Sequence, residues 1–114
     1  MEVYNDISRM IEAVKAFHLK HGFDISTGNL ETMLYRTNLL TEELGEIAQC
    51  LTKGKSKEQL AEEHADLFIL LLGNCIVMDI DLTVAFWEKI NKIMERKARK
   101  VGKNKRVSDW NNKT

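Results

Sequence analysis

The hydrophobic pattern divides the chain into four segments with helical spacing. Apolar side chains recur every three or four residues in each segment, whereas no stretch of useful length alternates between apolar and polar residues. The pattern therefore predicts helices and no strands. We expect four helices at about 3–21, 30–52, 56–78 and 81–101, separated by GFDISTGN, KGKS and a short DID turn. Short connections between four helices favour an all-α fold resembling a four-helix bundle.

Two of these helix starts have capping residues in the sequence. Ser56 followed by Gln59 is typical of a capping box, and Asp81 is a suitable N-cap for the fourth helix. We expect residues 1–102 to form a single helical domain. The remaining residues, 103–114, are expected to form a basic, flexible tail.

The second helix places carboxylates beside the face that it is expected to bury. At about 100° per residue, four apolar positions fall within roughly 40° of one another. This expected stripe consists of Leu40, Leu44, Ile47 and Leu51. Glu43 lies about 60° to one side of Leu40 and Glu46 about 120° to the same side, whereas Glu42 lies about 160° away. Glu43 and Glu46 therefore form a pair on one flank of the stripe.

The third helix repeats this arrangement. Its expected stripe consists of Leu60, Leu67, Leu71 and Met78. Glu63 and Asp66 stand at about the same two angles, roughly 60° and 120° from Leu60 on the same side. If the two helices pack antiparallel, we expect the four carboxylates to converge.

Converging carboxylates need a positive partner, because like charges repel and burial raises the free energy of each charge. Lysine or arginine side chains are one solution, and a divalent cation is a better one. Ligands that are all oxygen favour Mg²⁺, with Mn²⁺ as the alternative. A di-iron bundle would need Glu-x-x-His, and none of the three histidines has a glutamate three residues before it. The competing interpretation is that both acidic pairs are ordinary surface charges.

The motifs EELGE and EEHAD, followed by DIDLTVAFWEKI, resemble the MazG-like nucleoside triphosphate pyrophosphohydrolases of the all-α NTP pyrophosphatase superfamily. The resemblance covers about residues 30–100 and rests on an ExxE motif followed by ExxD. It implies that Glu43, Glu46, Glu63 and Asp66 hold Mg²⁺. It also implies cleavage of a nucleoside triphosphate between the α and β phosphates, and a homodimer or homotetramer. Nucleotide-pool cleaning is one role that such an activity would serve.

Other residues are candidates for contacts with the nucleotide. Glu46 is our choice for orienting the attacking water. Lys89, Lys92 and Arg96, expected on the fourth helix, are candidate phosphate ligands, although each could simply extend into solvent. The family's fourth helix often carries a Lys…Asn…Arg run, and here Ile93 stands where the Asn would fall. The resemblance therefore supports the metal ligands more strongly than the phosphate contacts.

Aromatic residues are the candidates for contact with a base. Phe17 and Tyr35 could stack on the ring, although aromatic residues more often belong to a core or an interface. The KGKSK loop, residues 53–57, could close over the phosphates. Trp87, Ile90 and Met94 form a second apolar strip on the fourth helix, and this strip favours oligomerisation.

Composition and charge restrict the remaining possibilities. The chain of 114 residues is 44% apolar and 30% charged, as is usual for soluble domains. The start of the sequence has no apolar stretch like that of a signal peptide, and the longest apolar run is too short to span a membrane. Two distant cysteines fit a reducing compartment. We therefore expect a cytoplasmic protein with no membrane partner.

Two alternatives remain open. The first is a phosphoribosyl-ATP pyrophosphohydrolase, a relative with similar acidic motifs. The second is a helical adaptor without catalytic activity, which would bind nucleic acid through the basic segment at residues 96–106. We regard nucleic-acid binding as the less favoured reading, because such a run is more often a solvated chain end.

Overall fold

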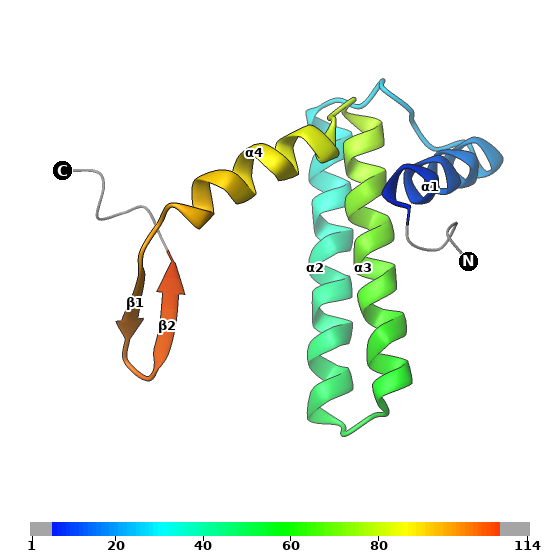
Figure 1. Cartoon of the computed structure of the whole chain (residues 1–114). Coiled ribbons are helices and arrows are strands. Elements are labelled where there is room, and N and C mark those ends of the chain that lie inside the picture. The colour runs from blue at the N-terminus through cyan, green and yellow to red at the C-terminus, as the bar shows by residue number, and fades with distance from the viewer. Residues whose placement is uncertain (1–5, 108–114) are drawn as a thin grey trace. The chain divides into compact units, whose positions relative to one another are not determined.

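The computed structural model describes residues 6–107 and contains four helices and one antiparallel hairpin within that range (Figure 1). The elements are α1 (Ile7–His21), α2 (Leu30–Thr52), α3 (Lys57–Val77), α4 (Leu82–Met94), β1 (Ala98–Val101) and β2 (Asn104–Val107). The chain divides into two units between Ile80 and Asp81, and the first unit contains α1, α2 and α3. The second unit contains α4 and the hairpin. The prediction of an all-α, bundle-like fold is confirmed.

Most helix boundaries follow the capping residues in the sequence. The α3 capping box is complete, because the Ser56 hydroxyl accepts from the Gln59 backbone N–H and the Gln59 side chain accepts from the Ser56 backbone N–H. The Asp81 carboxylate accepts from the backbone N–H of Val84 at 3.1 Å, as expected of an N-cap. At the first helix, the N-cap is Asp6. The expected start near residue 3 lies outside the described residues.

The predicted end of the fourth helix and the predicted absence of strands are wrong. The helix ends at Met94, and β1 pairs with β2 in the register Ala98↔Val107 to Val101↔Asn104. A two-residue turn connects the strands, with Gly102 at a φ of 63°, a conformation that glycine adopts without strain. Each strand has only four residues, and two of the four cross-strand pairs join like charges. The strands therefore lack the alternation of apolar and polar residues by which a strand is recognised in a sequence. Residues 103–107 of the expected tail belong to this hairpin, and the rest lie outside the described residues.

The first unit is built on the long pair α2 and α3, which run antiparallel and side by side, with α1 crossing α3 (Figure 1). Its apolar core consists of Val14 from α1, Ile47 and Cys50 from α2, and Leu72, Ile76 and Val77 from α3. Val14 and the three α3 residues lie toward the carboxyl end of α3, where α1 packs against it, whereas Ile47 and Cys50 lie toward the loop that joins α2 to α3.

The buried faces of α2 and α3 are rotated relative to the predicted stripes. Leu44 and Leu51 of the α2 stripe are 59% and 62% exposed, and Leu71 and Met78 of the α3 stripe are also exposed. On both helices, the side that faces the partner helix is shifted toward the carboxylate flank, by roughly 50° on α2. The expected stripes are wrong to this extent, and the shift brings acidic side chains into the seam between the helices.

The loop between α1 and α2 is attached to the end of α3. Ser26 N–H donates to the carbonyl of Ile76 at 2.9 Å, and Gly28 N–H donates to the carbonyl of Val77 at 3.0 Å. A side chain at Gly28 would overlap the Val77 side chain, so glycine is needed for this approach. These contacts hold the second half of the loop against the carboxyl end of α3.

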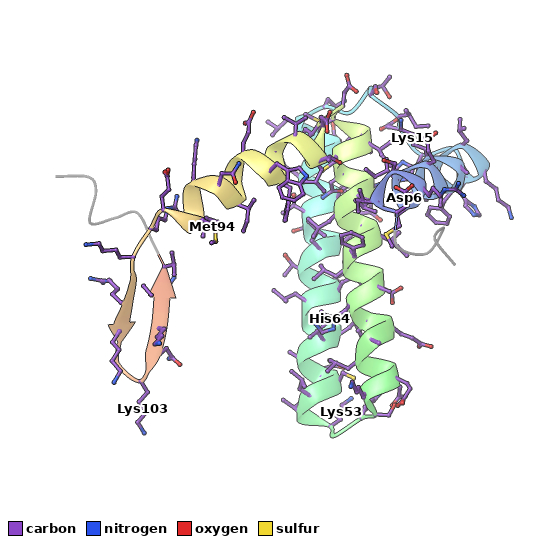
Figure 2. The ribbon with its side chains drawn as sticks, in the orientation of Figure 1. Asp6, Lys15, Lys53, His64, Met94 and Lys103 are labelled. Carbon is purple, nitrogen blue, oxygen red and sulfur yellow. The ribbon has the colours of Figure 1, made fainter. Side chains whose placement is uncertain are left out.

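Several large apolar side chains remain exposed. They include Leu44 and Leu51 on α2. Within the second unit they include Trp87 and Met94 on α4, which buries none of its side chains (Figure 2). Among the described residues, no single helix is both long enough and apolar enough to cross a membrane, although α3 and α4 together meet the length and composition criteria as a bent pair.

Candidate metal and active site

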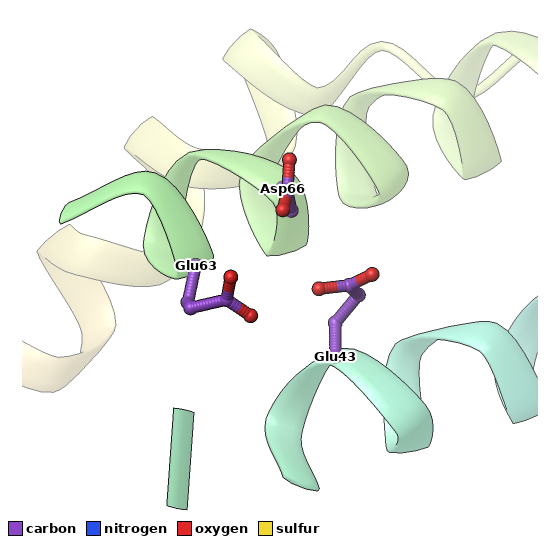
Figure 3. A group of neighbouring side chains, drawn as sticks. All are labelled: Glu43, Glu63 and Asp66. Atoms are coloured by element: carbon purple, nitrogen blue, oxygen red, sulfur yellow. The ribbon is translucent and has the colours of Figure 1, made fainter. Parts of the chain in front are cut away.

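Three of the four predicted metal ligands lie together between α2 and α3. Glu43, Glu63 and Asp66 each offer a carboxylate oxygen, and these oxygens all lie within 4.8 Å of one another. Figure 3 shows Glu43 projecting from one helix toward the two carboxylates on the other. Glu43 and Glu63 are half-buried, whereas Asp66 is exposed. The cluster is therefore open to solvent on the Asp66 side and can be reached by a ligand.

The cluster follows from the packing of the two helices. Because the seam is shifted toward the carboxylate flank, Glu43 points at α3 and Glu63 points at α2. Asp66 follows Glu63 by three residues, which places both on neighbouring turns of one face. The antiparallel arrangement then brings Glu43 to the same level along the helices as Glu63 and Asp66.

The electrostatics of the cluster disfavour three negative charges. Burial raises the pKa of Glu43, and the neighbouring carboxylates of Asp66, Glu63, Glu46 and Glu42 raise it further. The Oε2 atom of Glu43 is also buried without a hydrogen-bond partner. A buried carboxylate oxygen without a donor, facing two further carboxylates, fits a divalent cation that prefers oxygen ligands.

Glu46 lies beside this cluster and outside it. It lines a small cavity of about 90 Å³ together with Glu62, Glu63 and Lys55. Lys55 comes from the KGKSK loop, so one cation of that loop does lie next to the acidic residues. Because Glu63 borders both the cavity and the cluster, Glu46 can act on a group held by the cluster; its role as a fourth ligand stays a prediction.

The two aromatic candidates lie in one pocket of about 390 Å³, formed by α1, α2 and α3. Phe17 comes from α1 and Tyr35 from α2, and both have large exposed surfaces. The pocket also contains Arg36, which sequence reasoning missed. Arg36 lies only about 40° from Leu40 on the helix, so a charged residue within the expected buried face was the available signal.

The phosphate candidates belong to the second unit. Lys89 and Lys92 lie on α4, but Arg96 follows the end of the helix and is not on it, because α4 ends at Met94. Trp87 is 60% exposed and packs edge-to-face against Phe86, with ring centroids 5.2 Å apart. Contacts of these three cations with phosphate stay predictions.

Comparison with known families places the chain in a family of pyrophosphohydrolases. A family model described as phosphoribosyl-ATP pyrophosphohydrolase matches residues 8–93, which include both carboxylate-bearing helices. No curated protein and no solved structure matches the chain. The matched family is part of the all-α NTP pyrophosphatase superfamily, so the predicted resemblance holds at that level. The narrower MazG-like assignment stays a prediction.

Proposed function

Because the chain belongs to the phosphoribosyl-ATP pyrophosphohydrolase family, it is an enzyme that hydrolyses a pyrophosphate linkage in a nucleotide-like substrate, and we propose that this linkage joins the α and β phosphates of a nucleoside triphosphate. The products would be a nucleoside monophosphate and pyrophosphate. The observation that carries the proposal is the cluster of Glu43, Glu63 and Asp66, whose oxygens lie within 4.8 Å of one another.

The acidic cluster fits Mg²⁺ as the cofactor, with Mn²⁺ as the alternative. Glu43, Glu63 and Asp66 would hold the ion, and the buried Oε2 of Glu43 would gain the partner that it lacks. A triphosphate carries several negative charges and would otherwise be repelled by this site. When bound, the ion supplies positive charge for the phosphate oxygens and Lewis acidity at phosphorus.

Glu46 is the residue that we assign to the attacking water. It is exposed and shares the small cavity with Glu63, so water can reach its carboxylate. In the step proposed, Glu46 accepts a proton from water as the water oxygen bonds to the α phosphorus. The bond from the α phosphorus to the bridging oxygen breaks, and pyrophosphate leaves. Lys55, which lines the same cavity, can offset part of the charge on the leaving group.

The second candidate substrate is phosphoribosyl-ATP, and the family match favours it. The acidic cluster would serve the same hydrolysis in either case. A homodimer or homotetramer is our proposal for the assembly, supported by the exposed apolar side chains Leu44, Leu51, Trp87 and Met94. The cytoplasmic location also stays a prediction.

Release of pyrophosphate with and without Mg²⁺ tests the proposal directly. The assay should include the common nucleoside triphosphates and phosphoribosyl-ATP, with orthophosphate measured in parallel. We expect pyrophosphate only, and only with the metal. An Asp66→Asn variant should stay folded and lose at least about tenfold in turnover, since one ligand or electrostatic contact of this kind is worth roughly 10²–10³ in rate.

Glu42→Gln is the matched control, because Glu42 is exposed, lies about 100° from Glu43 around the axis of α2 and is not part of the cluster. It should retain nearly full turnover. Equal losses in Asp66→Asn and Glu42→Gln would contradict the assignment of the cluster. Absence of pyrophosphate release from every substrate would refute the proposed reaction.

A further inference from the structure

The pocket between α1, α2 and α3 contains a buried arginine that the proposed reaction does not use. Arg36 is only 8% exposed, and its Nε donates to the Oδ1 atom of Asn74 at 2.6 Å. Among the described residues, Arg36 forms no other hydrogen bond and no salt bridge, although the charge of Asp24 acts on it, and neither of its Nη groups is sealed from solvent. Both Nη groups therefore remain available to a ligand in the pocket that Arg36 lines.

The surrounding residues hold this guanidinium in place. His18 Nδ1 donates to the backbone carbonyl of Asp24 at 2.9 Å, which fixes the imidazole beside Arg36. A Cβ atom at Gly73 would lie 2.5 Å from Arg36 Nη2 and 2.8 Å from His18 Nε2. The absence of a side chain at Gly73 thus lets both nitrogens pack against α3. The guanidinium of Arg36 is therefore pre-organised for binding a ligand.

The walls of the pocket suit a planar ring more than a phosphate. Phe17, Phe23 and Tyr35 line it, together with aliphatic side chains of α2 and α3. Aromatic and aliphatic walls favour stacking of a flat heterocycle. Asp24 also lines the pocket and adds a negative charge near Arg36, which disfavours an anionic ligand. The ligand that fits is a neutral ring with hydrogen-bond acceptors.

The pocket lies at a suitable separation from the acidic cluster. Leu39 lines the pocket and precedes Glu43 by four residues, while Leu70 lines it and follows Asp66 by four residues. Four residues of helix rise about 6 Å, so the pocket begins one turn from the carboxylates along both helices. Phe17 also borders a second cavity that Asp66 lines. One nucleotide can thus place its base in the pocket and its phosphates at the cluster.

We propose that Arg36 selects the base of the substrate, and that the preferred base is guanine or another 6-oxopurine. This inference rests on the proposed function with a nucleoside triphosphate as the substrate, and it selects that substrate over phosphoribosyl-ATP, whose base is an adenine. Arg36 has only donors to offer, and its two free Nη groups match two adjacent acceptors. Guanine presents O6 and N7 side by side, whereas adenine presents N7 beside an amino donor. Adenine would leave one Nη group facing another donor.

Binding of nucleoside monophosphates tests this selectivity without requiring turnover. Isothermal titration in Mg²⁺ buffer should give GMP a lower Kd than AMP by about 5- to 150-fold, the range typical of a bidentate arginine contact. 7-Deaza-GMP lacks the N7 acceptor and should lose most of that advantage. 7-Deaza-AMP, compared with AMP, is the control and should change much less.

The Arg36→Lys variant supplies the complementary test, since lysine keeps the positive charge but lacks the planar guanidinium with its two Nη donor groups. If the variant is folded by circular dichroism, its GMP-to-AMP Kd ratio should approach one. The analogue series uses the unaltered protein, so the proposal remains testable if the variant does not fold. Equal Kd values for GMP and AMP, no measurable binding of GMP, or UMP binding as tightly as GMP would each overturn the assignment.

Failure of this inference can be distinguished from failure of the proposed function. Pyrophosphate release from ATP and GTP at equal kcat/KM, with equal binding of AMP and GMP, would refute base selection and leave the reaction intact. Selective GMP binding that depends on N7 and on Arg36, without pyrophosphate release from any substrate, would support base selection and refute the reaction.

Discussion

Removing the charge of Glu43 should stabilise the metal-free protein. Its carboxylate oxygen lies within 4.8 Å of oxygens from Glu63 and Asp66. Each such pair repels by about 0.9 kcal/mol at the dielectric constant of water, and physiological salt reduces this by roughly half. Because Glu43 is half-buried, the effective dielectric is lower, and we place the total at about 1–2 kcal/mol. Glu43→Gln in EDTA at pH 7 should therefore raise Tm by about 4–8 °C.

The pH dependence follows from the same repulsion. Burial and then the carboxylates of Asp66, Glu63, Glu46 and Glu42 raise the pKa of Glu43 above its ordinary value. In the window between the ordinary pKa and the raised one, the folded protein binds more protons than the unfolded chain. The contribution of Glu43 to stability is therefore most favourable below this window and is lost as the pH rises through the raised pKa. Glu43→Gln should remove that part of the pH dependence.

Mg²⁺ should reverse the ranking of the two proteins. A cation that binds the folded state raises stability by mass action, and the wild type should gain more than Glu43→Gln because the variant lacks a charged ligand. Scanning fluorimetry in EDTA and in millimolar Mg²⁺ measures both effects on the same samples. Glu42→Gln is the control, and because Glu42 is the weakest of the four carboxylates that raise the pKa of Glu43, it should change Tm much less than Glu43→Gln in EDTA and gain as much from Mg²⁺ as the wild type. A Glu43→Gln variant that is less stable in EDTA, or that gains as much from Mg²⁺ as the wild type, would refute the electrostatic argument.

Two further predictions concern packing and assembly. Gly73→Ala should lower the free energy of unfolding by about 1–3 kcal/mol through overpacking against Arg36 and His18, whereas Gly45→Ala, with open space around it within a helix, should raise it by about 0.5–1 kcal/mol. Thermal melts of both variants check this, and equal effects would contradict the packing. Light scattering should give two or four times the 13.2 kDa chain mass, and a monomer at all micromolar concentrations would refute the assembly.

The helices were predictable because their signals are local. The caps Ser56 and Asp81 predicted the starts of α3 and α4, and the spacing of apolar residues predicted α2 and α3 nearly to the residue. The hairpin was not predictable in the same way, because its strands carry charged rather than alternating side chains. Its one local signal is Gly102, and a single glycine within a basic run does not distinguish a hairpin turn from a helix end.

The sequence predicted which carboxylates lie on the matching flanks of the two helices, but not how many of them meet in the seam. Helical angles place Glu43 and Glu46 on one flank, and Glu63 and Asp66 on the matching flank. The angle of the seam between the helices depends on how whole faces pack, and single-helix periodicity does not contain that information. A shift of roughly 50° on α2 brought Glu43 into the seam, while Glu46 lies in the adjoining cavity. In the proposed function, these different positions assign Glu43 to the metal and Glu46 to the attacking water.

The same shift explains why polar groups are buried near the carboxyl end of α3. Rotating α2 toward its acidic flank also turns Arg36 inward. There, Asn74 Oδ1 accepts a hydrogen bond from Arg36 Nε, and Gly73 leaves room for the guanidinium. The apolar residues displaced from the seam, Leu44 and Leu51, then face outward. The rotation of α2 therefore produces an acidic cluster, a buried and oriented guanidinium one or two helical turns away, and an exposed apolar flank. A core built on the predicted stripes would be more apolar, but it would have neither the carboxylate cluster nor the buried arginine.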